Sequence, residues 1–292
     1  MNEIKGAGVA LVTPFKKDLS IDTVALKRLV EHQCSNGTDY LVVLGTTGES
    51  PVFSEHEIHL IVDTVKEANN NRLPLVLGVG GNHTMGVMDK LKTLDLKGFS
   101  AILSVSPYYN KPNQEGIFHH YSSLADASPL PIILYNVPGR TGSNVNAETT
   151  LRLAEHKNIC AVKEASGNFA QCMEIIKHRP SGFMVISGDD AFTFPFIAMG
   201  MDGVISVICN SFPKQFAQMV HAALANKMDE ARTLHYQLLD SMNLIFADGS
   251  PGGIKEILHY MGICEADVRP PLYAVNSTVK AKLIQTAKEI VG

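Results

Sequence analysis

One lysine stands where an apolar strand is expected. Lys163 interrupts residues 159–166, which otherwise have the composition of a strand buried on both faces. An unpaired charge in an apolar interior is costly, so a lysine at this place is either paired, in contact with solvent, or kept partly neutral for chemistry. Taken alone, an ion pair or a strand end is the plainer explanation, because lysine is rarely buried without a partner. The polar residues elsewhere in the chain favour chemistry.

A partly neutral lysine amine can attack a carbonyl group. At the ordinary lysine pKa of ~10.4, about one amine in a thousand is neutral near pH 7.4, and a desolvating interior or a nearby cation raises that fraction, as in Schiff-base lysines. The protonated imine then withdraws electrons from the neighbouring carbon, so that a proton leaves and an enamine nucleophile forms. Tyr135 can move that proton if a relay through Thr46 and a second tyrosine tunes its hydroxyl.

Each of these residues also has a plainer explanation. Tyr135 can be a strand residue whose hydroxyl finds any hydrogen bond, and Thr46 and Thr47 can form a tight turn between two glycines. Arg140 is well shaped to bind a carboxylate through two hydrogen bonds, although it can equally be a surface arginine. The combination of these residues favours a site that forms a Schiff base and binds an acid.

A metal or phosphate site finds less support. Four histidines lie on two predicted helices, and we expect them on helix surfaces: His56, His59, His119 and His120. The HExxH order of zinc enzymes is absent, so no metal is predicted. Asp189 and Asp190, after the seventh predicted strand, would repel a phosphate group where barrels often bind one. We expect these two carboxylates to cap the next helix.

Short apolar runs alternate eight times with longer stretches of helical periodicity. The runs are residues 8–13, 40–45, 75–79, 101–105, 132–137, 159–163, 183–187 and 203–208. Most are rich in Val, Ile and Leu, which is typical of parallel strands covered on both faces. Eight strand–helix units predict an α/β fold, a (β/α)8 TIM barrel. An open doubly wound sheet is the competitor, but the first run is followed by Thr13-Pro14-Phe15 and not by G-x-G-x-x-G.

The pattern becomes helical after residue 211. We expect a barrel carrying the active site over residues 1–225 and a C-terminal helical extension packed on it over residues 226–292, because no Pro/Ser-rich linker separates them. Active sites of such barrels lie at the carboxyl ends of the strands. Four predicted strands end in reactive side chains: Thr46, then Tyr108 and Tyr109, then Tyr135 and Arg140, then Lys163.

Composition narrows the class of protein. The 292 residues are 45% hydrophobic, which suffices for a large core, and the formal net charge of -4 with scattered basic residues argues against a nucleic-acid partner. The five cysteines are widely spaced without a CxxC pair, so we expect them to be reduced. We see neither a signal peptide nor an apolar run of the roughly 18 residues that span a bilayer, and expect a cytoplasmic protein with no membrane contact.

With these residues in place, the chain closely resembles, over essentially its whole length, the dihydrodipicolinate synthase branch of the pyruvate-dependent lyases. Four motifs carry the resemblance: GTTGE at 45–49, PYYNKP at 107–112 followed by QEG at 114–116, YNVPGRTG at 135–142, and VKEA at 162–165. Four motifs that occur in the order found in this family make the resemblance specific. The resemblance implies that pyruvate forms a Schiff base with Lys163 and that its enamine attacks L-aspartate 4-semialdehyde, without a cofactor, to make a ring precursor of lysine and diaminopimelate.

The resemblance also implies roles for matching residues. Tyr135, Thr46 and Tyr109 would form the proton relay, with Tyr109 reaching across from a neighbouring subunit. Thr46 and Thr47 would hold the pyruvate carboxylate. Most members that resemble this chain are homotetramers, a pair of tight dimers, and that assembly would complete the shared site.

Two further positions would contact the substrates. Arg140 would bind the carboxylate of the semialdehyde, and the backbone of Ile205 would line the pyruvate pocket. The resemblance therefore predicts pyruvate and L-aspartate 4-semialdehyde as small-molecule partners.

One departure concerns regulation. Feedback-inhibited relatives bind lysine at the tight-dimer interface, and this chain keeps three candidate contacts of that allosteric site: Ser50, Asn82 and Tyr108. Sensitive members carry two histidines and a glutamate where this chain has Glu55, Ile58 and Gly86. A carboxylate missing at Gly86 removes the partner of the ligand's ammonium group, a contact worth ~1.5 to 3 kcal/mol. We predict weak or absent inhibition by lysine.

Two other functions stay open at this point. Another pyruvate-Schiff-base lyase, such as N-acetylneuraminate lyase or a 2-keto-3-deoxy sugar acid aldolase, would share Lys163 and Tyr135, but its sugar pocket would need several hydroxyl-binding groups where this chain has Arg140. A catalytically silent barrel acting as a binding protein would be expected to lose the lysine, the tyrosine or the arginine. This chain keeps all three.

Overall fold

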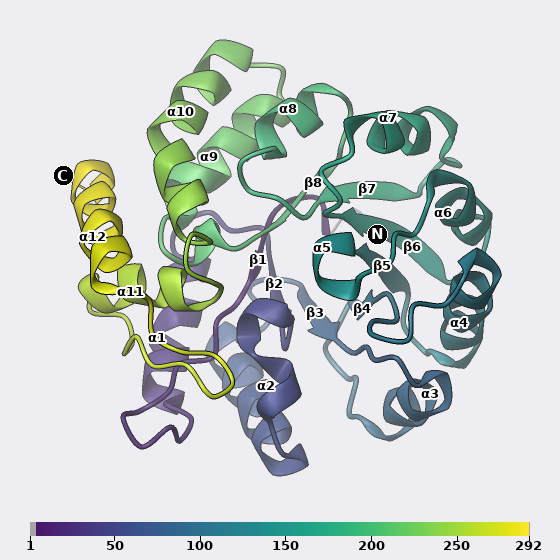
Figure 1. The fold of residues 1–292 in the computed structure, drawn as a ribbon, viewed down its shortest axis with the longest axis horizontal. Helices are drawn as coiled ribbons and strands as arrows, with labels where there is room; N and C mark the ends of the chain where they lie inside the picture. The colour runs from purple at the N-terminus through teal and green to yellow at the C-terminus, as the bar shows by residue number, and fades with distance from the viewer. Residues whose placement is uncertain (1–3, 292) are drawn as a thin grey trace.

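The eight apolar runs form a closed barrel. A computed structural model describes residues 4–291, in which the strands pair in parallel in chain order and β8 returns to β1 (Figure 1). The strands are β1 (Gly6–Ala10), β2 (Tyr40–Val43), β3 (Leu75–Gly78), β4 (Ala101–Val105), β5 (Ile132–Asn136), β6 (Ile159–Glu164), β7 (Met184–Ser187) and β8 (Gly203–Ser206). The predicted TIM barrel is therefore confirmed, and the open doubly wound sheet is excluded.

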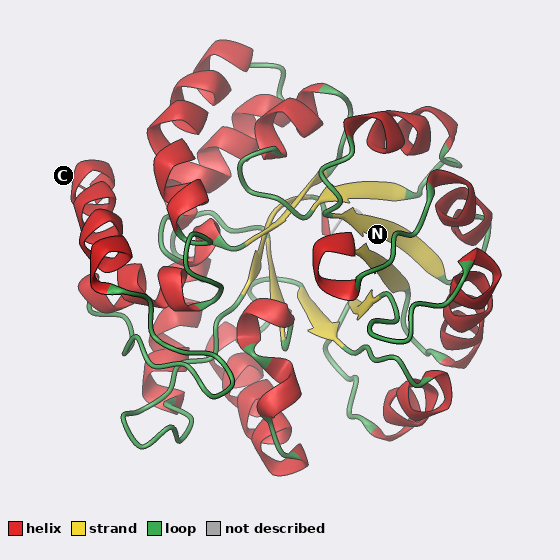
Figure 2. Ribbon diagram, viewed as in Figure 1, coloured by secondary structure: helices red, strands yellow, loops and turns green. Residues whose placement is uncertain are grey.

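Helices surround the strands (Figure 2). Those of the barrel are α1 (Thr23–Cys34), α2 (Glu55–Asn69), α3 (Thr84–Thr93), α4 (Gln114–Ala127), α5 (Pro138–Thr141), α6 (Ala147–Ala154), α7 (Phe169–His178), α8 (Thr193–Ala198) and α9 (Pro213–Leu224). Their starts follow local chemistry. Asp22 accepts from the N–H of Ala25, and Ser54 and Glu57 form a capping box at the start of α2.

Two apolar layers follow from the period of two along each strand. Inward side chains such as Ile133 of β5 and Ala161 of β6 form a cluster inside the barrel. Outward side chains such as Leu134 and Val162 belong to the larger cluster between strands and helices. A side chain at position 135 or 163 therefore points into the barrel, whereas one at position 136 or 164 points toward the helices.

Three more helices make up the C-terminal part: α10 (Met228–Leu244), α11 (Gly252–Tyr260) and α12 (Ser277–Val291). α10 packs on α9, and α12 packs on α10 and α11. In Figure 1 this group lies at one side of the barrel, near α1 and α9. The division into residues 1–225 and 226–292 stays a prediction. Within residues 4–291, no helix combines the length and apolar character that crossing a membrane requires.

One helix prediction is wrong. His120, expected on the surface of its helix, is only 3% exposed on α4, whereas His56, His59 and His119 are exposed as predicted. Its Nδ1 lies 2.9 Å from the hydroxyl of Thr84 at the start of α3. Burial lowers the pKa of His120 to about 4, so the ring is neutral at pH 7. Sequence reasoning missed it because the neighbouring His119 has the same residue type on an exposed face of the same helix.

Candidate active site

The lysine and the tyrosine singled out in the sequence face each other inside the barrel. Tyr135 of β5 lies opposite Lys163 of β6 in the strand register. The Nζ of Lys163 lies 4.3 Å from the centre of the Tyr135 ring, and the lysine is 5% exposed. Among residues 4–291, no carboxylate forms an ion pair with Lys163. Of the two plainer explanations, the ion pair is therefore excluded for the described chain, whereas Lys163 does lie one residue before the end of β6.

A glycine leaves room for the lysine side chain. Gly188 directly follows β7, and its N–H donates to the carbonyl of Glu164. A Cβ at this position would lie 3.0 Å from Cε of Lys163 and 2.6 Å from Cβ of Ala165. Atoms in proteins do not approach so closely, so any side chain at position 188 would displace Lys163 or the end of β6.

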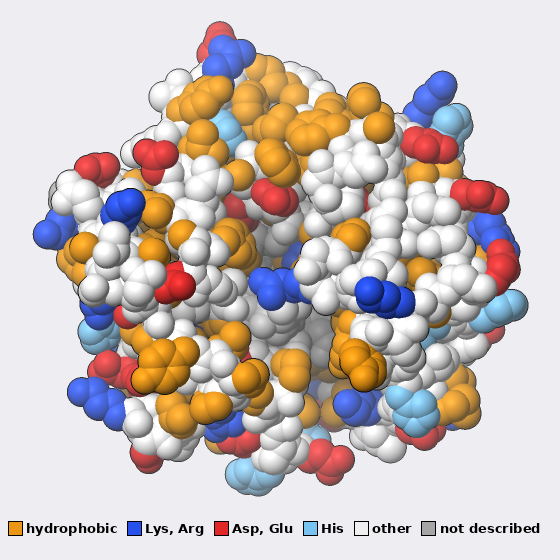
Figure 3. All heavy atoms as spheres, viewed as in Figure 1, with side chains coloured by type: hydrophobic (Ala, Val, Ile, Leu, Met, Phe, Trp, Pro, Cys, Tyr) orange, Lys and Arg blue, Asp and Glu red, His pale blue; other side chains and the backbone are white. Residues whose placement is uncertain are grey.

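A cavity of about 300 Å³ opens at the carboxyl ends of β2 to β5. Thr46, Tyr135 and Arg140 line it, together with Ser50 and Tyr108. Figure 3 shows that this face of the molecule is hollowed near its centre, with Lys or Arg side chains at the rim. A small, largely apolar hollow with a few convergent polar groups is the usual form of a small-molecule site.

Several of the predicted site residues lie outside the lining of this cavity, and Lys163 is one of them: it lies behind Tyr135, which does line the cavity. Thr47 is buried in the turn beside Thr46, and Ile205 is buried inside the barrel on β8, opposite Gly8 of β1. Tyr109 is 87% exposed and has a left-handed backbone, with φ of 73°. Among the described residues, no hydrogen bond joins Tyr109, the tyrosine predicted to complete the relay, to Tyr135 or Thr46.

The two threonines lie in one 3₁₀ turn, Thr46–Gly48, here called the Thr46 turn. The Gly48 N–H donates to the Gly45 carbonyl at 3.0 Å, and the hydroxyl of Thr13 donates to the Gly48 carbonyl at 2.7 Å. The next residue, Glu49, has φ of 60° and donates its N–H to the Thr46 carbonyl. The plainer prediction of a tight turn is correct, and the turn also places Thr46 in the cavity wall.

Arg140 lies on the short helix α5. Pro138 begins this helix, and Gly142 ends it in a left-handed conformation. Arg140 is exposed, and its side chain forms no hydrogen bond or ion pair within the described chain. A guanidinium group at the cavity wall with its donors unused is suited to bind a carboxylate.

A buried carboxylate behind the strands was missed by the sequence reasoning. Glu164 points outward from β6 and accepts from Asn136 at 3.0 and 3.1 Å, from Gln171 at 3.0 Å and from the N–H of Ser166 at 2.8 Å. Asn136 also accepts from the N–H of Val145, which follows the Arg140 helix. This amide cradle therefore joins the strand ends that carry Tyr135 and Lys163 to the segment that follows Arg140.

A second missed carboxylate is Glu49. Its Oε1 lies 2.6 Å from Nζ of Lys255 on α11, and neither side chain is more than 1% exposed. Burial lowers the pKa of Lys255, and the charge of Glu49 opposes that shift. The sequence held a signal for this lysine, which interrupts an apolar helix in the same way that Lys163 interrupts an apolar strand. The partner, 206 residues away, has no such signal.

The prediction that Asp189 and Asp190 cap the next helix is only partly right. Asp189 accepts from the N–H of Phe192 just before α8. Asp190 instead accepts from the N–H groups of Val207 and Ile208, at 2.8 Å for the shorter bond, at the end of β8. Burial raises the pKa of Asp190 to about 6. The N–H donors nearest to Asp190 belong to the end of β8, and the order of the elements in the sequence does not show that this strand end lies beside Asp190.

A larger hollow of about 590 Å³ adjoins the cavity and shares Ser50 and Tyr108 with it. Glu55 and Ile58 line this hollow at the positions where the sequence departs from lysine-sensitive relatives. Asn82 donates to the carbonyl of Tyr108 at 3.1 Å. Of the three residues predicted to be remnants of a regulatory site, Ser50 and Tyr108 thus line both hollows, and Asn82 is bonded to Tyr108.

No cluster of three or more His, Cys, Asp or Glu side chains suited to a metal ion occurs in residues 4–291.

Known proteins resemble this chain over its full length. It is 54% identical to 4-hydroxy-tetrahydrodipicolinate synthase of Flavobacterium psychrophilum, with 99% of each chain covered, and 53% identical to the protein of the same name from Parabacteroides distasonis, with 98% and 97% covered. The crystal structure of the chloride-inhibited dihydrodipicolinate synthase from Acinetobacter baumannii complexed with pyruvate is 36% identical, covers 99% of both chains and superposes with a TM-score of 0.96. The model of the dihydrodipicolinate synthetase family matches residues 3–290, and the chain belongs to that family.

Proposed function

We propose that this protein condenses pyruvate with L-aspartate 4-semialdehyde to form 4-hydroxy-tetrahydrodipicolinate, the ring precursor of lysine and diaminopimelate. The observation that carries the proposal is Lys163, an inward lysine without an ion-pair partner in the described chain, whose Nζ lies over the ring of Tyr135. Tyr135 in turn lines a cavity together with Thr46 and Arg140. The curated relatives of that name and the relative solved with pyruvate support it.

The chemistry begins at the Lys163 amine. It attacks the ketone carbon of pyruvate, and loss of water gives a protonated imine. Loss of a proton from the methyl carbon gives the enamine, whose carbon attacks the aldehyde carbon of the semialdehyde. The amino group of the semialdehyde then displaces the Lys163 nitrogen and closes the ring, so one water is released overall. No metal or organic cofactor is required, because the imine itself accepts the electrons.

Tyr135 is the proposed acid and base of these steps, with Thr46 and Tyr109 completing the relay. Tyr135 and Thr46 share one cavity wall. The exposure of Tyr109 supports a role for it in the site of a neighbouring subunit, because its side chain is free of its own cavity. Thr46 and Thr47 would hold the pyruvate carboxylate, and the backbone of Ile205 would border it.

Arg140 is proposed to select the second substrate. Its unused donors at the cavity wall suit the carboxylate of a short aldehyde. A sugar acid would need several hydroxyl-binding groups in the same place. The assignment therefore favours L-aspartate 4-semialdehyde over the longer substrates of related lyases.

We further propose a homotetramer built as a pair of tight dimers, located in the cytoplasm. A relay that needs Tyr109 from another subunit requires at least a dimer. Lysine is expected to inhibit weakly or not at all, because Glu55, Ile58 and Gly86 replace the ligand contacts of sensitive relatives. Steady-state inhibition by L-lysine tests this point, and an inhibition constant below the millimolar range would contradict it.

The deciding experiment for the reaction is the intact mass of the protein after incubation with pyruvate and borohydride, followed by peptide mapping, with and without L-aspartate 4-semialdehyde. A reduced pyruvyl adduct on Lys163 that the semialdehyde depletes supports both substrates. The variant Lys163→Ala should form no adduct, while Lys92→Ala, which changes an exposed lysine, should form it as the parent does.

The other outcomes separate the competing functions. An adduct that the semialdehyde does not deplete would keep the Schiff base and indicate a sugar acid lyase. If no adduct forms, the enzyme assignment fails and the silent barrel becomes the better explanation.

A further inference from the structure

The C-terminal extension holds a carboxylate that borders the candidate active site. Oε1 of Glu49 accepts from Nζ of Lys255 at 2.6 Å, and Oε2 accepts from the backbone N–H of Arg269 at 2.9 Å. Lys255 also donates to the carbonyl of Asp267 at 2.8 Å. Both oxygens of a side chain near the start of the protein are thus bound by residues more than 200 positions further on.

The backbone of Glu49 closes the Thr46 turn. Its φ of 60° is a left-handed conformation that is unfavourable for a residue with a side chain. In this conformation its N–H donates to the carbonyl of Thr46 at 3.1 Å. Such a conformation persists where surrounding contacts fix it, and beside the backbone bonds to Thr46 and Val52 the contacts that fix Glu49 are those of its carboxylate.

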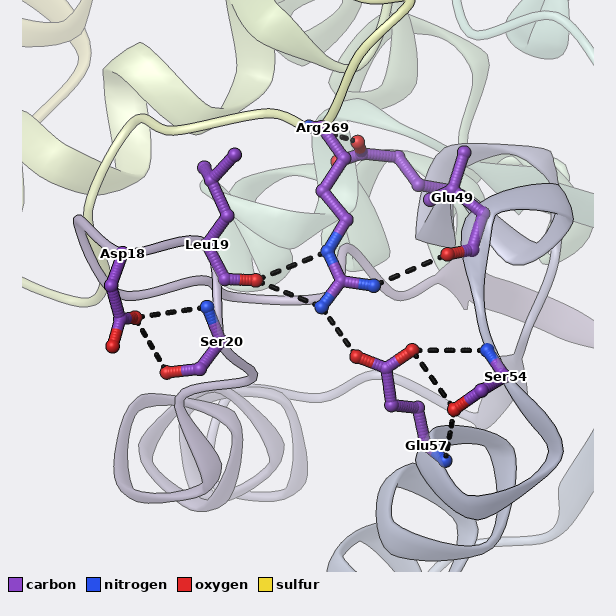
Figure 4. A network of polar contacts seen from close by, with 8 residues as sticks. Asp18, Leu19, Ser20, Glu49, Ser54, Glu57 and Arg269 are labelled. Carbon is purple, nitrogen blue, oxygen red and sulfur yellow. Dashed lines mark hydrogen bonds and ion pairs between the residues drawn. The ribbon is translucent and has the colours of Figure 1, made fainter.

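The segment that binds Glu49 is itself anchored. The Arg269 guanidinium donates to the carbonyls of Leu19 and Val52 and pairs with Glu57 in the first turn of α2 (Figure 4). It also lies over the ring of Phe15, whose other close cation is Lys255 at 4.1 Å. Arg269 thus joins the extension to segments on both sides of the Thr46 turn in the sequence.

We propose that Glu49, Lys255 and the backbone of Arg269 form a clamp that positions the Thr46 turn, so that the C-terminal extension sets the geometry of Thr46 and Thr47 toward the carboxylate of pyruvate. None of the three touches substrate; each acts through the turn. The inference rests on the proposed function, because it assigns pyruvate to these threonines. It gives the extension a role in substrate binding and not only in packing.

The test compares Glu49→Gln, Lys255→Met and the double variant E49Q/K255M with the parent in steady-state kinetics. We expect the KM for pyruvate to rise roughly tenfold in each, because a small displacement of a positioning group costs that order of affinity. The KM for the semialdehyde should stay within about twofold, because Arg140 lies on α5, which the clamp does not contact. The double variant should melt above either single variant, since it leaves no lone buried charge, and yet keep the raised KM.

Lys280→Met is the matched control. It breaks the 2.9 Å ion pair between Lys280 and Glu256 inside the extension and does not involve Glu49. It should lower the melting temperature without raising the KM for pyruvate. Glu49→Asp serves if the other variants do not fold: it keeps a charge beside Lys255 but shortens the reach of the clamp, and should raise the KM severalfold.

A folded clamp variant that binds pyruvate as the parent does, with only a lower melting temperature, would overturn the proposal and leave the clamp a purely structural contact. So would a rise in KM for Lys280→Met equal to that of Glu49→Gln. Failure of the proposed function would look different, because the parent protein itself would then form no adduct with pyruvate or would not turn over the semialdehyde.

Discussion

Glu49 and Glu164 are both buried carboxylates beside the candidate active site, yet they are held in opposite ways. Glu49 is paired with a cation 206 residues away, whereas Glu164 accepts from amide and backbone donors no more than 28 residues away. A cation compensates the buried charge but must be imported from a distant part of the chain. Neutral donors are available locally and leave the negative charge uncompensated.

The difference separates two tasks. The Glu49 clamp joins the beginning and the end of the protein, so its loss should lower the stability of the whole fold. The amide cradle around Glu164 joins neighbouring strand ends, so its loss should displace Tyr135 and Lys163.

The largest expected effect is on the clamp. Lys255→Met leaves Glu49 buried without a cation, which should lower the free energy of unfolding by about 3–5 kcal/mol. Urea denaturation at pH 7 measures it. The double variant E49Q/K255M should recover part of the loss, and a double variant no more stable than Lys255→Met would contradict the view that the lone charge is the cost.

Glu164→Gln should lower the free energy of unfolding by less than Lys255→Met. The amide group of glutamine faces the donors of Asn136 and Gln171, so some buried donors lose their acceptor, at about 1–3 kcal/mol. The same denaturation series checks it, with kcat measured in parallel. A loss as large as that of Lys255→Met, with kcat unchanged, would remove the distinction between the two sites.

Carboxylates paired with a cation and carboxylates held by neutral donors should also respond differently to a fall in pH. Cation-paired Glu57 has its pKa lowered to about 2 by Arg269, while Asp190, held by backbone donors, has its pKa raised to about 6 by burial. Between pH 6 and the unfolded value of 3.8 the folded protein binds the extra proton at Asp190, so this group stabilises the fold as the pH falls and the gain is lost as the pH rises through 6.

Asp190→Asn removes that gain. From pH 7.5 to pH 5 the parent should therefore gain about 1–2 kcal/mol of unfolding free energy relative to the variant. Denaturant unfolding at the two pH values gives the difference. A difference that does not change with pH would mean that Asp190 is ionised in the folded protein throughout this range.

The smallest effect is expected at the surface. Glu31 and Arg72 form an exposed ion pair at 2.6 Å, and the guanidinium lowers the pKa of Glu31 to about 2. Solvent and salt screen such a pair, so Glu31→Gln should leave the melting temperature nearly unchanged. A loss close to that of Lys255→Met would show that burial is not what distinguishes the Glu49 pair.

The barrel and much of the site could be predicted because their signals are local. Strands buried on both faces appear as short apolar runs, and Lys163 is conspicuous as a charge inside one of them. His120 and Asp190 were misjudged because their environment comes from other elements: α3 in the first case and the end of β8 in the second. Lys255 is conspicuous by the same rule as Lys163, but only the fold shows that its partner is Glu49.

The clamp also orders events during synthesis of the protein. The Thr46 turn leaves the ribosome early, while Lys255 and Arg269 are translated 206 and 220 residues after Glu49. A nascent chain therefore carries its reactive-site threonines for most of translation without the contacts that fix them. A polypeptide released before residue 269 would have all eight strands, Lys163 and Tyr135, yet would bind pyruvate poorly. Incomplete products of translation would therefore hardly react with this metabolite.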